Sequence, residues 1–128
     1  MERSDADLRA VPEGGVLRTL PNGIRIIRRR KHEPGANLLE LSRGALARLT
    51  DKVNGSKFLP RTTLARIVEM TAEVLLENQA APGSNTSYNK VFAEPIGISA
   101  GRLVRALRIQ RCWNGTVAHG YPVNENAL

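Results

Sequence analysis

Aromatic side chains are scarce in this 128-residue chain, at 4% of residues, although 41% of its residues are hydrophobic. A core must therefore be built from Leu, Ile, Val and Ala, and the length fits a single domain. A single cysteine, Cys112, excludes an internal disulfide and a zinc site made of several cysteines. No apolar run approaches the roughly 20 residues that span a bilayer, and the polar N-terminus does not resemble a signal peptide. We therefore expect a soluble, cytoplasmic protein without a membrane partner.

Sequence patterns that mark catalytic or metal centres are also missing. The two histidines, His32 and His119, are far apart and do not have the spacing of metal ligands. Cys112 has no catalytic signature around it and is more simply a small buried group. Gly14-Gly15 is a turn signal and not a phosphate-binding loop. The sequence therefore predicts that the protein is not an enzyme and has no cofactor, no metal and no catalytic residues.

Positive charge is what the sequence has in excess. The net charge is +7, and the basic residues are 15 arginines against four lysines. Arginine offers a planar fork of donors that suits phosphate. The charge is uneven, since residues 16–31 sum to +6 and residues 79–111 to +4, whereas residues 61–78 sum to −1. Two basic segments beside a neutral one are typical of nucleic-acid binders, although arginines that are merely solvated would give the same composition.

Apolar periodicity predicts a mainly α fold with a small N-terminal β-hairpin, an α+β arrangement. The three main helices are expected near residues 43–54, 60–78 and 100–112. Pro60 suits a first helical position, and Ser42 and Ser99 suit the N-caps of the other two helices. The helix at 60–78 should be the core helix, because it places these residues on one face: Leu64, Ile67, Val68, Thr71, Leu75 and Asn78.

Domain boundaries follow from the turn signals. Residues 1–15 are predicted to be a flexible arm, residues 16–112 a single basic domain, and residues 113–128 an irregular tail. Asn22-Gly23 is the strongest short hairpin signal, because both residues tolerate positive φ. The hairpin ends in the cations Arg28 to Lys31, which suit either a basic ribbon along DNA or a charged edge strand that resists aggregation.

One stretch, NKVFAEPIGISAGRLVRALR at residues 89–108, resembles the helix-turn-helix of DNA-binding proteins. The pattern's small residue, turn glycine and apolar anchor match Ala93, Gly97 and Leu103, whereas Pro95 departs from it by falling inside the first helix. The resemblance implies that the second helix faces duplex DNA, with Arg105 reading a guanine edge.

A second stretch, residues 38–78, resembles the ribbon-helix-helix regulators, which have a short strand followed by two helices. That resemblance implies a homodimer in which strands of two copies pair. The six-residue Asn54–Leu59 connection is longer than usual, and Glu40 has the wrong sign for a strand that faces a groove.

The function predicted from the sequence is therefore nucleic-acid binding, most simply of duplex DNA by a transcription regulator or accessory factor. RNA binding or ribosome association remains an alternative, as does an oligomeric protein-interaction or assembly subunit. The predicted DNA contacts are Ser99, Arg102, Arg105, Arg108, Arg111, Arg25, Arg28, Arg29, Arg30 and Lys31.

Overall fold

A computed structural model describes residues 3–12, 14–28, 38–41, 56–80, 87–112 and 117–128, and the side chains of 38–41, 111, 112 and 117–119 are not part of that description. The elements in chain order are α1 (Asp5–Arg9), β1 (Val16–Thr19), β2 (Arg25–Arg28), β3 (Leu38–Leu41), β4 (Lys57–Phe58), α3 (Leu64–Glu77), β5 (Tyr88–Val91), β6 (Gly97–Ser99), β7 (Arg102–Val104), β8 (Ala106–Cys112), β9 (Val117–Val123) and a 3-10 turn (Glu125–Ala127).

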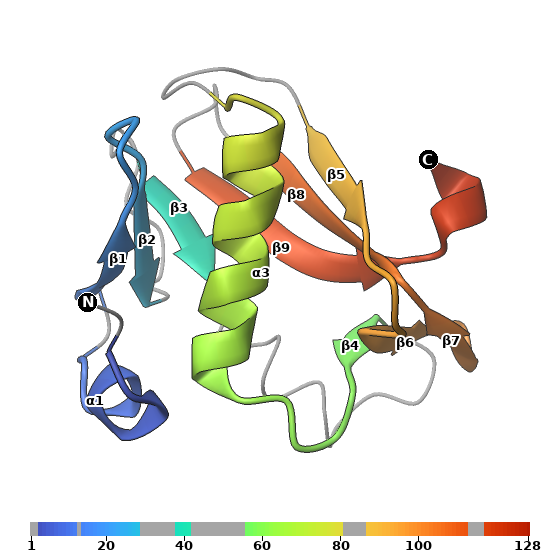
Figure 1. Cartoon of the computed structure of the whole chain (residues 1–128), viewed down its shortest axis with the longest axis horizontal. Coiled ribbons are helices and arrows are strands. Elements are labelled where there is room, and N and C mark those ends of the chain that lie inside the picture. The colour runs from blue at the N-terminus through green and yellow to red at the C-terminus, as the bar shows by residue number, and fades with distance from the viewer. Residues whose placement is uncertain (1–2, 13, 29–37, 42–55, 81–86, 113–116) are drawn as a thin grey trace.

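The strands form two sheets among the described residues. A six-stranded sheet has the order β1-β2-β3-β9-β8-β5, and a three-stranded sheet has the order β4-β6-β7. Within the larger sheet β3 runs parallel to both β2 and β9, and the other neighbours are antiparallel. Helix α3 lies across one face of the larger sheet, and the smaller sheet projects beyond its end (Figure 1).

The mainly α prediction is therefore wrong: the described fold is mixed, with more strand than helix. Residues 100–112 form β7 and β8 and not a helix. The apolar spacing at residues 100–112 wrongly indicated a helix, because β8 lies inside the sheet and several of its residues are buried. Ala106, Leu107 and Ile109 are all 0% exposed. Buried and less buried residues alternate only from Leu107 to Gln110, because Ala106 is buried as well, and a short apolar run of this kind also fits a helix.

The predicted core helix is confirmed as α3, although it starts later than expected. Thr63 is its N-cap and accepts a hydrogen bond from the Arg66 N–H at 3.1 Å, so Pro60 precedes the helix. The residues predicted on the core face are buried, except Asn78. The Asn78 side-chain amide donates hydrogen bonds to the Val74 and Asn89 carbonyls. The predicted helix at 43–54 lies outside the described residues.

The hairpin prediction is also confirmed, in β1 and β2. Gly23 has a φ of 88°, and the Asn22 side chain accepts a hydrogen bond from the Ile24 N–H at 3.1 Å, which closes the turn. The hairpin is not a free basic ribbon, however, because β2 pairs with β3 on its other side.

The predicted irregular tail contains β9, which lies between β3 and β8 in the larger sheet. Gly120 and Pro122 suggested turns in the sequence, but here they occupy strand positions opposite Ile109 and Leu107. The domain therefore continues past residue 112, because its inner strands include the segment that was assigned to the tail.

The predicted N-terminal arm contains α1, which packs against α3. Ser4 caps α1 by accepting a hydrogen bond from the Asp7 N–H, and Leu8 is buried in the core at 3% exposure. The Asp5 carboxylate accepts a hydrogen bond from the Ala65 N–H at 3.0 Å, so it satisfies a free donor in the first turn of α3.

We expect Asp5→Ala to lower the free energy of unfolding by about 1 kcal/mol at pH 7, the usual cost of losing a helix cap. The hydrogen bond from the Ala65 backbone, and then the Arg9 guanidinium, lower the pKa of Asp5. The folded protein thus holds the charged form more strongly than the unfolded chain does. This stabilisation is complete above the unfolded pKa of about 3.9 and is lost as the pH falls through the lower folded pKa.

Urea unfolding at a series of pH values from 7 to 2 measures this effect. The difference between the wild type and Asp5→Ala should shrink as the medium is acidified below pH 4. Asp7→Ala is the matched control, because it removes the same charge from the same helix without removing the contact with α3. A constant difference at every pH would contradict the capping role.

Candidate nucleic-acid interface

The smaller sheet presents one row of side chains to the body and one to solvent. Lys57 pairs with Ile98, and Ile98 pairs with Leu103 on its other side. Directly paired residues point to the same face of a sheet, and Leu103 is 65% exposed, so this row faces outward. The neighbouring row faces the body and is buried: Phe58, Gly97 and Val104.

Two glycines determine how this sheet is placed. A methyl group on Gly97 would lie 2.5 Å from the Lys57 carbonyl oxygen and 2.6 Å from the ring of Pro122, so the absence of a side chain lets β6 approach β9. The β6–β7 turn is Ala100-Gly101, with φ angles of 51° and 76°. Positive φ at both central residues is typical of the tight turns that join twisted strands, and it gives a narrow, projecting hairpin.

Two serines and an arginine form a polar row across the outer end of this sheet. The hydroxyl oxygens of Ser56 and Ser99 are 3.2 Å apart, and Ser99 is paired with Arg102 beside the turn. A guanidinium group next to two hydroxyl groups offers several donors within a small area. Donors of this kind are the usual protein contacts to phosphate oxygens.

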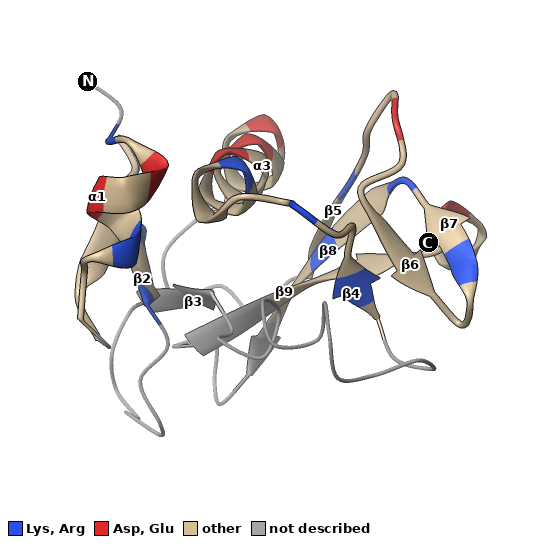
Figure 2. Cartoon of the chain, turned by 90° about the horizontal axis from the view of Figure 1, so that it is seen from below, with Lys and Arg blue, Asp and Glu red and all other residues tan. Residues whose placement is uncertain are grey.

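Three cations lie on or beside this sheet, on β4, on the loop that leads to α3 and on β7 (Figure 2). They are Lys57, Arg61 and Arg102; the two arginines are exposed and Lys57 is half-buried. Within the described part of the chain, none of the three makes a hydrogen bond or an ion pair. No Asp or Glu occurs in β4, β6, β7 or residues 59–63. Lys57 belongs to the outward row, whereas Ser99 and Arg102 continue the row of Gly97 and Val104 at the hairpin end, so these cations border the small sheet on both of its faces. We call Lys57, Arg61, Ser99 and Arg102 the small-sheet patch.

Two of the predicted DNA-contacting arginines are engaged inside the protein. The Arg105 guanidinium forms an ion pair with Glu125 at 2.8 Å, and it is not on a helix that could enter a groove. The Arg108 side chain donates to the Asn89 side-chain oxygen at 3.0 Å. The helix that was predicted to carry both arginines into a groove is therefore absent, whereas their contact with DNA stays a prediction.

The hairpin cations do not form one surface with the small-sheet patch either. Arg28 donates to the backbone carbonyls of Arg9 and Val11, at 2.6 and 2.9 Å, so its guanidinium ties α1 to the sheet. Arg25 is exposed, but β2 is at the opposite side of the fold from β7 (Figure 1). Arg29, Arg30 and Lys31 lie outside the described residues, as does the side chain of Arg111.

Neither resemblance to a regulator family agrees with the described backbone. Residues 89–108 form β5, β6, β7 and the start of β8, so the two helices of a helix-turn-helix are not present there. In the second case, a strand does occupy residues 38–41, but β2 and β9 flank it on both sides. It therefore has no free edge that could pair with another copy.

Sequence reasoning missed Lys57 and Arg61, which lie in KFLPRTTLAR at residues 57–66. This stretch contains three cations and no carboxylate, and that local pattern was the available signal. Summing the charge over residues 32–60 and 61–78 concealed it, because the glutamates of α3 cancel Arg61 and Arg66.

Comparison with protein-family models, with curated proteins and with solved structures found no match to this chain. Within the described residues, no three His, Cys, Asp or Glu side chains lie close enough together to hold a metal ion. No helix in that part of the chain has the length and apolar character needed to cross a membrane.

Proposed function

We propose that this protein binds duplex DNA through the small-sheet patch, by contacts to the sugar–phosphate backbone. The observation that carries the proposal is the segregation of charge. Three cations that have no partner among the described residues come from three separate segments, none of which contains a carboxylate, whereas most other described cations have internal partners. Exposed cations in such a region attract a polyanion.

Duplex DNA is preferred over single strands because the patch offers charge and hydroxyl groups without aromatic rings. Phe58, Tyr88 and Phe92 are buried, and the Tyr121 hydroxyl donates to Gln110. Binding of single-stranded nucleic acid usually depends on bases stacking on exposed rings. A patch of Lys, Arg and Ser side chains suits phosphate oxygens instead.

The proposed binding does not depend on the base sequence. Arg105, the residue predicted to read guanine, is paired with Glu125, and the patch donors suit phosphates more than base edges. An accessory role, such as packaging DNA or holding it for another protein, fits this chemistry better than sequence-specific regulation.

The salt dependence of binding tests the proposal. Three neutralised phosphates give a slope of roughly −2.7 for the logarithm of the association constant against the logarithm of salt concentration. We expect fluorescence anisotropy to give this slope for two 20-base-pair duplexes of unrelated sequence, with equal affinity for both. Tighter binding to single strands or to double-stranded RNA of the same sequence would overturn the choice of duplex DNA, and a slope near zero would overturn the proposal as a whole.

A further inference from the structure

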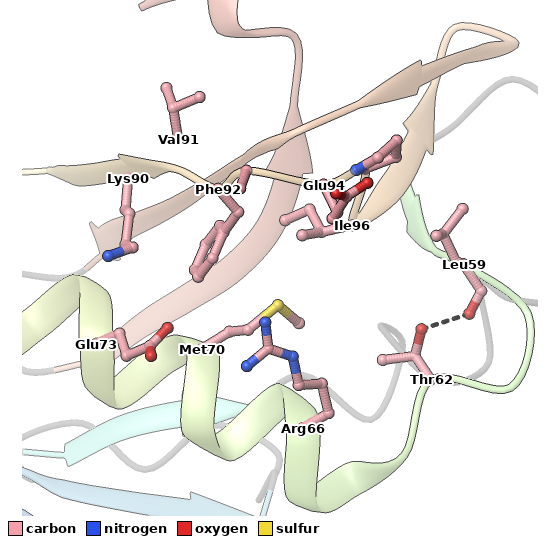
Figure 3. Close-up of a pocket in the computed structure, with 12 residues that line it drawn as sticks. Leu59, Thr62, Arg66, Met70, Glu73, Lys90, Val91, Phe92, Glu94 and Ile96 are labelled. Carbon is pink, nitrogen blue, oxygen red and sulfur yellow. Dashed lines mark hydrogen bonds between the residues drawn. The ribbon is translucent and has the colours of Figure 1, made fainter.

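A second surface, separate from the small-sheet patch, is an open groove of about 500 Å³ between α3 and the segment from β5 to β6. Figure 3 shows Arg66, Met70 and Glu73 of α3 on one side, facing Lys90, Phe92, Glu94 and Ile96 on the other. Its floor is apolar, since Met70, Phe92 and Ile96 are buried there. One side of its lining is the continuous stretch from Lys90 to Ile96, which suits an extended occupant.

One wall of the groove is the outer edge of the larger sheet, where the Asn89 carbonyl already accepts a hydrogen bond from the Asn78 side chain at 3.0 Å. Strand β5 is the last strand and pairs only with β8 among the described residues. The Phe92 N–H donates to the Arg105 carbonyl at 2.8 Å, so by the alternation of an antiparallel ladder the N–H and C=O groups of Val91 point away from β8. Val91 is also 44% exposed. An exposed edge with free backbone groups can accept another strand.

Four charged side chains line the groove, and among the described residues only its two cations have ion-pair partners. Arg66 and Lys90 lie over the Phe92 ring, with their charged groups 5.7 and 5.3 Å from its centre. Arg66 forms an ion pair with Glu69 at 2.6 Å, and Lys90 forms one with Glu77 at 2.5 Å.

The remaining two charges at the groove are both negative. Glu73 is half-buried on α3 and Glu94 is exposed on the other wall, and neither has an ion-pair or hydrogen-bond partner in the described part of the chain. This groove is therefore an acidic site on a protein whose net charge is +7. Its charge complements a basic occupant.

We propose that the groove binds an extended peptide segment of a partner protein, with an apolar residue at its centre and Lys or Arg on both sides. The segment adds to β5 as a further strand and forms backbone hydrogen bonds with Val91. Its apolar side chain packs on Phe92 and Met70, while its cations approach Glu73 and Glu94. The outer strand edge provides affinity, and the two carboxylates select basic segments over acidic ones.

Two fluorescein-labelled, acetylated heptapeptides test this proposal with the full chain: Ser-Lys-Ser-Leu-Ser-Lys-Ser and Ser-Glu-Ser-Leu-Ser-Glu-Ser, in which the charged residues share one face of the strand with the central Leu. The net charge of the protein by itself favours the acidic peptide. We nevertheless expect the wild type to bind the basic peptide about tenfold or more tightly than the acidic one. The double variant Glu73→Lys/Glu94→Lys should reverse this preference.

The single variants Glu94→Lys and Asp7→Lys form a matched pair, because each changes the net charge equally and both residues are exposed. Asp7→Lys measures how much the higher net charge alone weakens binding of the basic peptide. Glu94→Lys should weaken this binding further, because Glu94 lines the groove. Methylation of the central backbone nitrogens of the peptide should weaken its binding to the wild type by about tenfold, since it removes donors to the strand.

The N-methylated peptide leaves the protein unchanged, so its result does not depend on the folding of a variant. Equal binding of both peptides by the wild type, or no binding of either, would overturn the proposal. A preference that survives the double charge reversal would exclude the two carboxylates as its cause, and indifference to N-methylation would exclude strand addition.

Discussion

Replacing Lys57, Arg61 and Arg102 together with glutamine should weaken binding to a 20-base-pair DNA duplex by about 100-fold at low salt, or roughly a factor of five for each lost phosphate contact. The salt slope should fall at the same time, by about one for each cation removed. Both effects follow because these side chains lie outside the internal ion pairs of the described fold. Anisotropy titrations at several salt concentrations measure the affinity and the slope together.

A second triple variant provides the control. Replacing Arg9, Arg66 and Arg105 with glutamine lowers the net charge by the same three units, but these arginines are paired with Asp5, Glu69 and Glu125 at 2.6–2.8 Å. We expect the affinity of this variant for DNA to fall by less than about fivefold. That loss reflects only the weaker long-range attraction between a less positive protein and the phosphates. Equal losses in the two variants would show that binding follows net charge, and the small-sheet patch would then not be the interface.

The elements that the sequence predicted correctly are those whose signals are local. Helix α3 combines an apolar stripe, the Thr63 cap and flanking breaks within about 20 residues, and the β1–β2 turn needs only Asn22 and Gly23. In both cases the residues that decide the structure are neighbours in the chain, so their pattern is visible without knowledge of any distant partner.

The inner strands could not be predicted in this way, because long-range pairing decides them. β8 is buried by α3 on one face of the sheet, and its partner β9 contains the turn-forming residues Gly120 and Pro122. Ala100 and Leu103 share helical spacing with Leu107, but Ala100 lies in the β6–β7 turn and Leu103 is 65% exposed. The strand arrangement therefore depends on where distant segments meet.

The same limit applies to the candidate site. The sequence shows how many arginines there are, but not which of them have partners. Arg105 meets Glu125 across 20 positions in sequence, and Arg108 meets Asn89 across 19. Conversely, Lys57 and Arg102 lie on the two outer strands of one small sheet although they are distant in sequence, because both strands pair with β6. Of the predicted contacts Ser99 and Arg102, Arg102 is exposed and Ser99 is half-buried, and both lie on a hairpin and not on a helix.

Replacing Gly97 with alanine should lower the free energy of unfolding by about 2–4 kcal/mol, with a fall in melting temperature of roughly 10 °C. The added methyl group would lie 2.5 Å from the Lys57 carbonyl oxygen and 2.7 Å from Cβ of Pro122. One obstacle is the backbone of a paired strand, and the other is a buried ring in β9, so neither can yield by rotating a flexible side chain. The strands must separate to accept the change.

Gly101→Ala distinguishes this crowding from the general cost of replacing a glycine. Nothing lies within 4 Å of a methyl group at Gly101, and its φ of 76° leaves only the backbone penalty, about 1–2 kcal/mol. Thermal unfolding should therefore rank Gly97→Ala as the more costly change. If Gly101→Ala cost as much, β6 would not be held tightly against β9. Since β6 joins the strands that carry Lys57 and Arg102, Gly97→Ala should also weaken DNA binding, whereas Gly101→Ala should alter only the tip of the hairpin.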